Sequence, residues 1–225
     1  MALVPLNLPA GVYRNGTDLQ SQGRWRDSNL VRWFDDTLRP IGGWRTRSDT
    51  ASAGQVRGMH SWIDNSSDRW ISAGSYNKLY IYSGAGIQYD ITPTGFTAGN
   101  EDALQPVGYG NSFYGQEYYG TARQESVTIT PATTWSSDSW GQYLVACSSS
   151  DGKVYEWQLN TGTIAAVIAN APVNNRSILV TEERFLMCLG AGGNPRLVQW
   201  SDREDNTVWT PAATNEAGSL ELQTT

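Results

Sequence analysis

The side chains that most often carry catalysis are sparse in this chain of 225 residues. His60 is its only histidine, which argues against a Ser-His-Asp triad, a histidine-rich zinc site or a proton shuttle. It lies beside Met59 and close to Trp62 in a strand-like run, so we expect a structural role for it. Asp35-Asp36 and Glu182-Glu183 are adjacent pairs. Neighbouring strand residues point to opposite faces, so neither pair forms an acid-base dyad.

Glycine-rich segments in the chain lack the spacing that binds phosphate. The sequence has no GxxxxGK[ST] motif and no GxGxxG after a strand, and we interpret Gly84-Ala85-Gly86 and Gly190-Ala191-Gly192-Gly193 as turns. We therefore assign no catalytic residue, no cofactor, no metal ligand and no enzymatic activity. A glycosidase can use two isolated carboxylates, but no pair of that kind is marked in this sequence.

A different chemistry is concentrated in residues 24–47, where arginine and tryptophan alternate. The residues concerned are Arg24, Trp25, Arg26, Arg32, Trp33, Trp44 and Arg45. Arginine stacked on tryptophan is favourable by about 0.5–1 kcal/mol when exposed, and both types are enriched at binding hot spots. A protein interface is the interpretation we favour. Internal Arg–Trp packing and single-stranded nucleic-acid binding are the alternatives.

A second candidate surface is the Tyr/Gly-rich segment within residues 94–130. It is too long for an ordinary connection, so we interpret it as an insertion that protrudes from one face. Its tyrosines could contact a partner at low entropic cost, or the loop could cover a sheet edge. The four candidate contact residues are Tyr109, Tyr114, Tyr118 and Tyr119.

Composition indicates the elements that position these residues. The chain is 39% hydrophobic, 11% aromatic and only 17% charged, with 23 glycines. This profile is typical of β-structure and poor for helices. No apolar run is long enough to cross a membrane, and the first residues do not resemble a secretory signal. Residues 1–23 are interrupted by prolines and glycines, so we expect an extended N-terminal arm.

The net charge of -6 is unevenly distributed, with +3 over residues 1–60 and -9 over residues 61–225. An acidic surface of this kind serves solubility. It also suits a wall past which DNA slides without binding, because phosphate binding requires basic clusters.

The architectural signal is a hairpin that recurs. In residues 138–157 the apolar run Tyr143–Cys147, a polar turn ending in Asp151-Gly152 and the alternating run Lys153–Trp157 predict two antiparallel strands. Similar pairs occur at 70–82 and 185–200, each with a leading strand before it and a closing strand after it. We expect the closing strands at 87–91, 164–168 and 207–209, and the leading strand of a fourth copy at 219–222.

The basic residues of the repeat, Lys78, Lys153 and Arg196, are spaced as propeller blades plus one insertion. We therefore predict an all-β fold: a β-propeller of four-stranded antiparallel blades, partial in this chain, with a β-sandwich as the alternative. The expected division is an N-terminal arm and hairpin over 1–53, then blades over 54–225 with an insertion at 94–130. Either residues absent from this sequence complete the ring, or other chains cover an open arc.

Cys147 and Cys188 align at the same strand position in two copies, where the first copy has Ala73. Equivalent positions in successive blades lie too far apart for a disulfide. We therefore predict two free, buried cysteines that fill the core.

Two stretches resemble a known family. GRWRDSNLVRWFDDTLRPIGGWRTRS followed by GQVRGMHSW resembles the opening of tail hub, or nozzle, proteins of short-tailed bacteriophages, also called packaged-DNA stabilisation proteins. DSWGQYLVACSSSDGKVYEW resembles their propeller blades, and GYGNSFYGQEYYGTAR the kind of insertion that they carry. The resemblance covers roughly residues 5–211, and relatives of this kind are about twice as long as this chain.

The resemblance implies a structural protein of the virion tail, assembled in the host cytoplasm. Such proteins form a homo-oligomeric ring, typically a hexamer, below the portal and adaptor, and contact tail fibre, spike or needle proteins. Their lumen is the DNA exit channel, with transient non-specific contact to viral DNA, and they help to retain and release the genome. A propeller carbohydrate-binding module or glycosidase and a host-interaction scaffold outside virions are the alternative functions.

Overall fold

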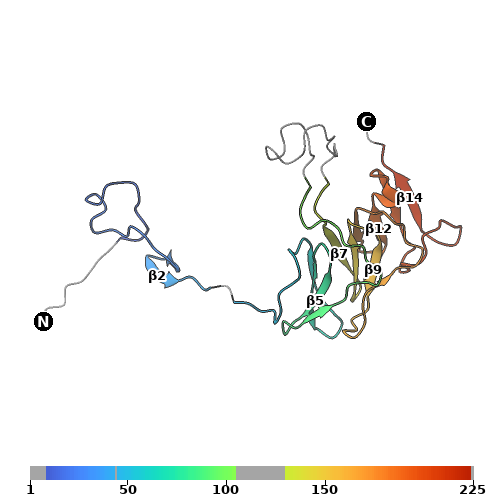
Figure 1. The fold of residues 1–225 in the computed structure, drawn as a ribbon, viewed down its shortest axis with the longest axis horizontal. Coiled ribbons are helices and arrows are strands. Elements are labelled where there is room, and N and C mark those ends of the chain that lie inside the picture. Colours follow the sequence, from blue (N-terminus) through green and yellow to red (C-terminus); the bar gives the residue numbers. More distant parts are fainter. Residues whose placement is uncertain (1–8, 44, 105–129, 224–225) are drawn as a thin grey trace, which may run out of the picture. The chain divides into compact units, whose positions relative to one another are not determined.

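The computed structural model describes residues 9–43, 45–104 and 130–223. The chain divides into two compact units, Met1–Thr46 and Arg47–Thr225 (Figure 1). We call them the N-terminal unit and the body, and describe each by itself.

A hairpin in the N-terminal unit is formed by β1 (Val31–Phe34) and β2 (Thr37–Pro40). Phe34 pairs with Thr37, so the connection has two residues. Asp35 and Asp36 both adopt positive φ, at 46° and 55°, as a type I′ turn requires and as aspartate tolerates. The hairpin predicted from the sequence within residues 1–53 is therefore present.

Over its described residues the body is all-β, as the composition predicts, and the strands there form three sheets of four consecutive antiparallel strands. The first sheet contains β3 (Met59–Ile63), β4 (Arg69–Gly74), β5 (Leu79–Ser83) and β6 (Gln88–Asp90). The second contains β7 (Trp135–Trp140), β8 (Tyr143–Ser148), β9 (Val154–Trp157) and β10 (Ala166–Val167). The third contains β11 (Ser177–Val180), β12 (Leu186–Leu189), β13 (Leu197–Trp200) and β14 (Gly218–Glu221), with a short 3-10 turn at Ala191–Gly193.

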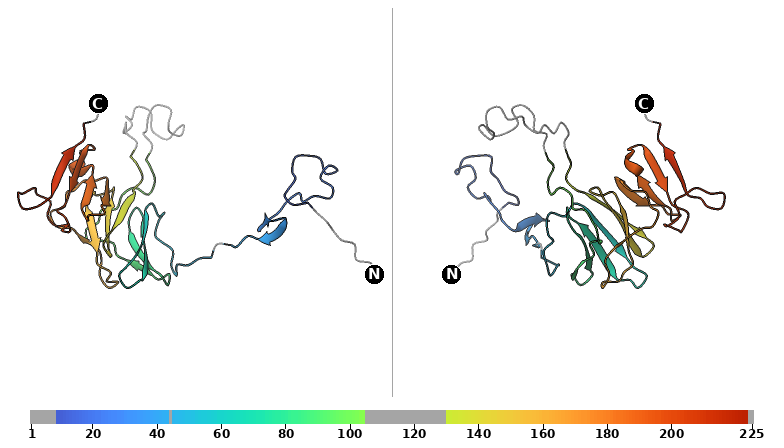
Figure 2. Two further views of the ribbon diagram at one scale, coloured as in Figure 1. Left: turned by 180° about the vertical axis from the view of Figure 1, so that it is seen from behind. Right: turned by 45° about the vertical axis from the view of Figure 1, so that its right-hand side comes forward.

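The three sheets stack face to face, and two apolar cores fill the space between them (Figure 2). The second sheet lies in the middle and is buried on both faces. In β8, Leu144 and Ala146 belong to the core shared with the first sheet, whereas Val145 and Cys147 belong to the core shared with the third. Opposite faces alternate along a strand, which explains why this run is continuously apolar.

The first strand of each sheet lies beside the first strand of the next. The Trp62 indole at the end of β3 donates to the Gln142 carbonyl in the β7–β8 turn, at 3.0 Å. The next junction repeats this order, since the Arg184 guanidinium of the β11–β12 turn lies over the Trp140 ring, 5.1 Å from its centroid. The Val180 amide also donates to an Asp138 carboxylate oxygen at 2.7 Å. β3, β7 and β11 are therefore stacked in the same orientation.

Two strand assignments near the end of the sequence are wrong. Thr207–Trp209 is a loop, not the closing strand, and its Trp209 side chain is buried in the core with the indole N–H donating to the Asn206 carbonyl at 2.7 Å. Residues 219–222 do not begin a fourth copy, because β14 pairs antiparallel with β13 and closes the third sheet.

The predicted alignment of Ala73, Cys147 and Cys188 at one strand position is also wrong, and for Ala73 and Cys147 the error is one residue. Ala73 pairs with Tyr80 and Ala146 pairs with Tyr155, so the counterpart of Ala73 is Ala146. Cys147 and Cys188 instead lie on facing sheets in one core. Both are free and buried, as predicted. Burial, with a smaller contribution from Asp151, raises the pKa of the Cys147 thiol to about 12, so it stays protonated and inert.

The chain segment that contains the predicted insertion connects the first and second sheets. Leu104 and Thr130 form an antiparallel bridge there, with amide–carbonyl distances of 2.9 and 3.2 Å. Over the described parts of the chain, no helix is long and apolar enough to cross a membrane.

Candidate protein interface

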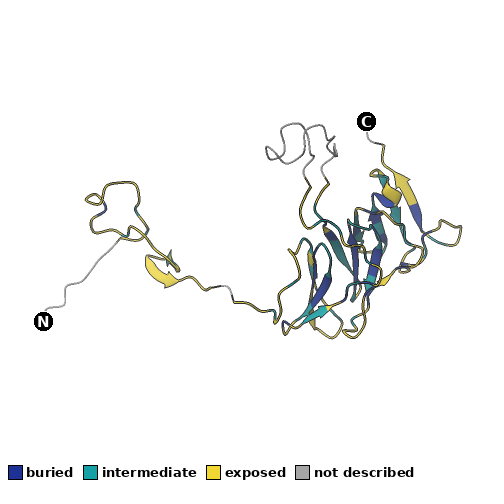
Figure 3. Cartoon of the chain, viewed as in Figure 1, coloured by how far each residue is buried: buried dark blue, intermediate teal, exposed yellow. Residues whose placement is uncertain are grey.

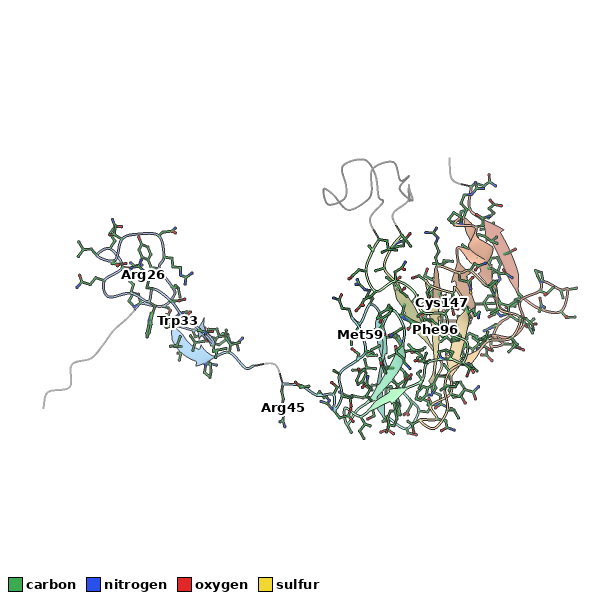
Figure 4. All side chains as sticks on the ribbon, viewed as in Figure 1. Arg26, Trp33, Arg45, Met59, Phe96 and Cys147 are labelled. Atoms are coloured by element: carbon green, nitrogen blue, oxygen red, sulfur yellow. The ribbon has the colours of Figure 1, made fainter. Side chains whose placement is uncertain are left out.

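The N-terminal unit contains most of the described residues that the sequence marks for binding. Trp25 and Trp33 meet there with their ring centroids 5.7 Å apart and an interplanar angle of 56°. Trp33 comes from β1, and Trp25 is held by a parallel bridge to Val12 and by the Tyr13 amide, which donates to the Trp25 carbonyl at 2.8 Å. Both indole N–H groups are shielded from solvent and lack a hydrogen-bond partner. Figure 4 shows the hairpin around Trp33.

Two arginines of this unit stack on tyrosine and phenylalanine rings, and not on the tryptophans that alternate with arginine in the sequence. Arg24 lies over the Tyr13 ring at 5.1 Å, and Arg39 lies over the Phe34 ring at 4.8 Å. Arg26 forms an ion pair with Asp18. Internal Arg–Trp packing, one of the interpretations drawn from the sequence, is therefore not found among these described contacts.

Two further arginines are directly opposite each other on the hairpin. Arg32 of β1 pairs with Arg39 of β2, and both are exposed. Like charges at facing positions of a strand pair are unfavourable. The pair thus concentrates positive charge where an acidic partner would relieve the repulsion. Arg45, beyond the hairpin, is exposed as well.

Most residues of the same unit are exposed (Figure 3), large apolar ones among them. Leu19 is 81% exposed, Leu30 70%, Phe34 50% and Ile41 49%. Among the described residues before Arg47, Ser21 is the only one that is buried. A two-stranded hairpin without a core is marginally stable in water, so this unit has the properties of a segment that folds against a partner.

Sequence reasoning singled out the arginines and tryptophans but missed these apolar residues. The signal was available, since Leu30, Phe34 and Leu38 recur around a short strand pair that has no apolar layer to pack against. Five predicted contact residues lie outside the described residues and are not assessed by the structure. They are Trp44, Tyr109, Tyr114, Tyr118 and Tyr119.

A separate polar cluster lies in the body, between β3 and β7. His60 Nε2 and Ser139 Oγ are 2.8 Å apart, and the His60 ring stacks on Trp62 with centroids 5.8 Å apart. Burial lowers the pKa of His60, and the Asp138 carboxylate partly opposes this shift. Asp138 itself accepts hydrogen bonds from the Ser139 and Val180 amides, so its carboxylate bridges strands β7 and β11.

This cluster has the residue types of a Ser-His-Asp triad without its connectivity. In a triad the aspartate binds the second ring nitrogen of the histidine, whereas Asp138 binds backbone amides. The geometry supports the structural role that the sequence predicts for His60: the imidazole ties the first strand of one sheet to the first strand of the next. In the parts of the chain that the structure describes, no group of three or more His, Cys, Asp and Glu side chains is arranged to hold a metal ion.

Comparisons of the chain with protein-family models, with curated proteins and with solved structures gave no match.

Proposed function

We propose that this chain is a structural protein of a virion, the tail hub or nozzle of a short-tailed bacteriophage. In this proposal the body is part of a β-propeller that serves as a rigid scaffold, and the N-terminal unit attaches it to a neighbour. The main observation in support is the stack of three sheets, each made of four consecutive antiparallel strands. The first strands of these sheets, β3, β7 and β11, lie next to each other and run in the same direction. Radial repetition of such sheets is the plan of a propeller.

The attachment role is supported by the contrast between the two units. The N-terminal unit exposes Leu19, Leu30 and Phe34 and has six arginines against four aspartates. The body contains ten basic and eighteen acidic residues. An exposed basic segment with aromatic anchors fits an acidic protein surface, such as the body of a neighbouring copy or an adaptor ring above it.

The arrangement of the tryptophans disfavours the carbohydrate-binding alternative. Sugar stacking requires exposed aromatic faces, yet five of the seven tryptophans of the body are buried and the other two, Trp70 and Trp200, are half-buried. The five buried ones are Trp62, Trp135, Trp140, Trp157 and Trp209. Their indoles fill the space between sheets. The ring of Trp135, for example, lies against Gly74, and its N–H donates to the Ser75 carbonyl at 2.7 Å. These residues therefore act as core, which suits a scaffold better than a lectin.

Virion composition and cryo-electron microscopy of the tail test this proposal. We expect the chain in purified particles, in a ring below the adaptor. Substituting Arg32→Glu together with Arg39→Glu should reduce its incorporation, because it inverts the charge of the hairpin that we assign to attachment. The matched control is Arg203→Glu, which inverts one exposed arginine of the body. Virions that lack the chain in the tail would overturn the proposal.

A further inference from the structure

The hairpin of the N-terminal unit is a two-stranded sheet, so each of its strands has a free edge. The Ile41 amide donates to the Leu30 carbonyl at 2.8 Å, just beyond the last strand pair. Hydrogen-bonded and non-hydrogen-bonded pairs alternate along an antiparallel ladder. Val31 and Trp33 are therefore at the non-hydrogen-bonded positions of β1, and their amide and carbonyl groups point away from β2, toward the outer edge of β1.

The two edges of this sheet differ in their protection. Pro40 of β2 pairs with Val31, so its nitrogen points outward but has no proton to donate, which blunts the β2 edge. The β1 edge has no such residue. In the part of the chain that the structure describes, no backbone hydrogen bond reaches the amide or carbonyl of Val31 or Trp33. Unpaired backbone groups in a row are a template for a further strand, so β1 is the edge to which a strand can add.

The hairpin also gains stability from an added strand. An isolated two-stranded hairpin is marginally stable in water, and three or more strands with a hydrophobic face are needed for independent stability. Two apolar side chains at the ends of β1 lack cover, because Leu30 is 70% exposed and Phe34 is 50% exposed. The added strand therefore has to satisfy the outward backbone groups and to bring apolar side chains beside these two residues.

Strand β1 of a second copy meets both requirements. In antiparallel pairing with Val31 opposite Trp33 of the second copy, the outward amides and carbonyls of both copies bind each other. The same register places Leu30 opposite Phe34. Each of these pairs occurs twice, so four of the five facing pairs are apolar, and pairs of aromatic with aliphatic residues stabilise antiparallel strands. A shift by two residues is disfavoured, since it places Val31 opposite Asp35, which lies in the turn with φ of 46°.

The fifth pair is unfavourable, because it places Arg32 opposite Arg32 of the second copy. Like charges at facing positions cost about as much as one favourable pair contributes, so the four apolar pairs outweigh this one. The hairpin as a whole adds no repulsion. Asp35 and Asp36 in its turn balance Arg32 and Arg39, which leaves residues 30–41 without net charge.

We infer that two copies of this chain pair through the β1 edge and form one four-stranded sheet in the order β2–β1–β1–β2. A twofold axis passes beside Arg32, and the interface is isologous, so the assembly closes at two copies. The pairing protects an open edge of the chain in solution. It leaves both faces of the hairpin uncovered, including the arginines that we assign to attachment. The inference concerns the N-terminal unit alone and stands whether or not the chain is a virion protein.

Cysteine cross-linking of the 225-residue chain tests the inference and its register. Arg32→Cys places the thiols of two copies at facing non-hydrogen-bonded positions, where Cα atoms are about 4.5 Å apart and a disulfide can form. Arg39→Cys is the matched control. Arg39 is exposed on the same face, but three strand spacings separate it from its counterpart, about 14 Å. The native Cys147 and Cys188 are buried and do not interfere.

Under a mild oxidant, we expect a disulfide-linked dimer from Arg32→Cys, at a yield at least about tenfold above that of Arg39→Cys, because only the first pair is within disulfide reach. Analytical ultracentrifugation of the reduced chain is the second arm. Arg32→Thr removes the repelling pair and keeps a strand-forming residue, so it should tighten the dimer by about threefold or more. Arg39→Thr should have a smaller effect. Added salt should strengthen the wild-type dimer, because it screens the Arg32 pair.

Each arm has an outcome that would overturn the inference. In the first arm it is the absence of cross-linking by Arg32→Cys, or an equal yield from Arg39→Cys, which would indicate random collision. In the second arm it is an Arg32→Thr chain that stays monomeric at every concentration. A wild-type dimer that dissociates as salt is raised would also overturn it, because opposite charges would then hold the two copies together. Circular dichroism verifies that each variant folds as the wild type does.

Discussion

Gly74 occupies a position in β4 where no larger residue fits. A Cβ built there would lie 2.2 Å from atoms of the Trp135 ring, and that ring is fixed because its indole N–H donates to the Ser75 carbonyl. We predict that Gly74→Ala lowers the free energy of unfolding by about 1–3 kcal/mol, the usual cost of overpacking. Urea denaturation measures this. Gly84→Ala is the control, since its Cβ would have no neighbour closer than 3.5 Å; equal effects of the two substitutions would contradict the prediction.

His60 predicts how stability depends on pH. Burial lowers its pKa below the ordinary value of 6.5, with partial opposition from Asp138. The unfolded chain therefore binds this proton more readily than the folded chain. The resulting stability is fully present above pH 6.5 and is lost as the pH falls toward the folded pKa. We expect a lower urea midpoint near about pH 5.5 than at neutral pH, because the unfolded imidazole is mostly charged at that lower pH.

His60→Gln separates this effect from the titration of carboxylates. The glutamine amide can still bind Ser139 but takes up no proton in this interval. The variant should lose less stability than the wild type between neutral pH and the mildly acidic range. Parallel curves for the two proteins would mean that another group carries the pH dependence.

At the scale of elements, periodicity predicts strands where a side-chain pattern and a turn occur together. The sequence predicts β8 and β9 correctly, because an apolar run, an Asp-Gly turn and an alternating run follow one another there. Thr207–Trp209 has the composition of a strand, but the Trp209 indole is drawn into the core between two sheets, and the backbone there forms a loop. Tertiary burial outweighs local propensity at this point. The pairing of β14 with β13 is not predictable from the local pattern, because a long loop separates the two strands.

The sequence predicts which residue types make up the candidate interface, but it does not predict which of these residues contact each other. The alternation of arginine and tryptophan distinguishes the N-terminal unit. Which side chains stack on each other depends on the backbone geometry, and no local sequence pattern specifies that geometry. Leu30, for example, adopts positive φ at 59° just before β1, and Trp25 contacts Trp33 instead of an arginine. The exposed apolar surface, in contrast, has a signal in the sequence, since Leu30, Phe34 and Leu38 recur around a short strand pair.

The division into two units predicts that the body folds alone. Every residue of both apolar cores lies in Arg47–Thr225. We expect that removal of residues 1–46 leaves the unfolding temperature of the body unchanged within error. Removal of β14 alone should lower this temperature, because β13 then loses one of its two neighbouring strands. Differential scanning calorimetry distinguishes the two truncations. A large loss of stability on removing the N-terminal unit would show that the body depends on it.

At the scale of the whole molecule, the excess of acidic residues in the body predicts that it binds DNA weakly. Ten basic and eighteen acidic residues in Arg47–Thr225 disfavour phosphate binding, which depends on clustered lysine and arginine and on the release of counterions. We predict that the chain does not retain double-stranded DNA in a gel-shift assay at physiological salt. Asp68, Glu204 and Glu216 are exposed, and substituting all three with lysine should produce salt-sensitive retention. Asparagine and glutamine at the same positions form the control, since they remove charge without adding a cation.

The same variant links this electrostatic property to the proposed role. If the chain lines a path through which a genome leaves the particle, added cations near that path slow the passage of DNA, and particles assembled with the lysine variant should eject more slowly than those with the amide control. Single-particle fluorescence of ejection measures the rate. A lysine variant that retains DNA in the gel but ejects at the wild-type rate would mean that these carboxylates keep the protein soluble and lie away from the DNA. The channel assignment would then have to rest on other faces of the body.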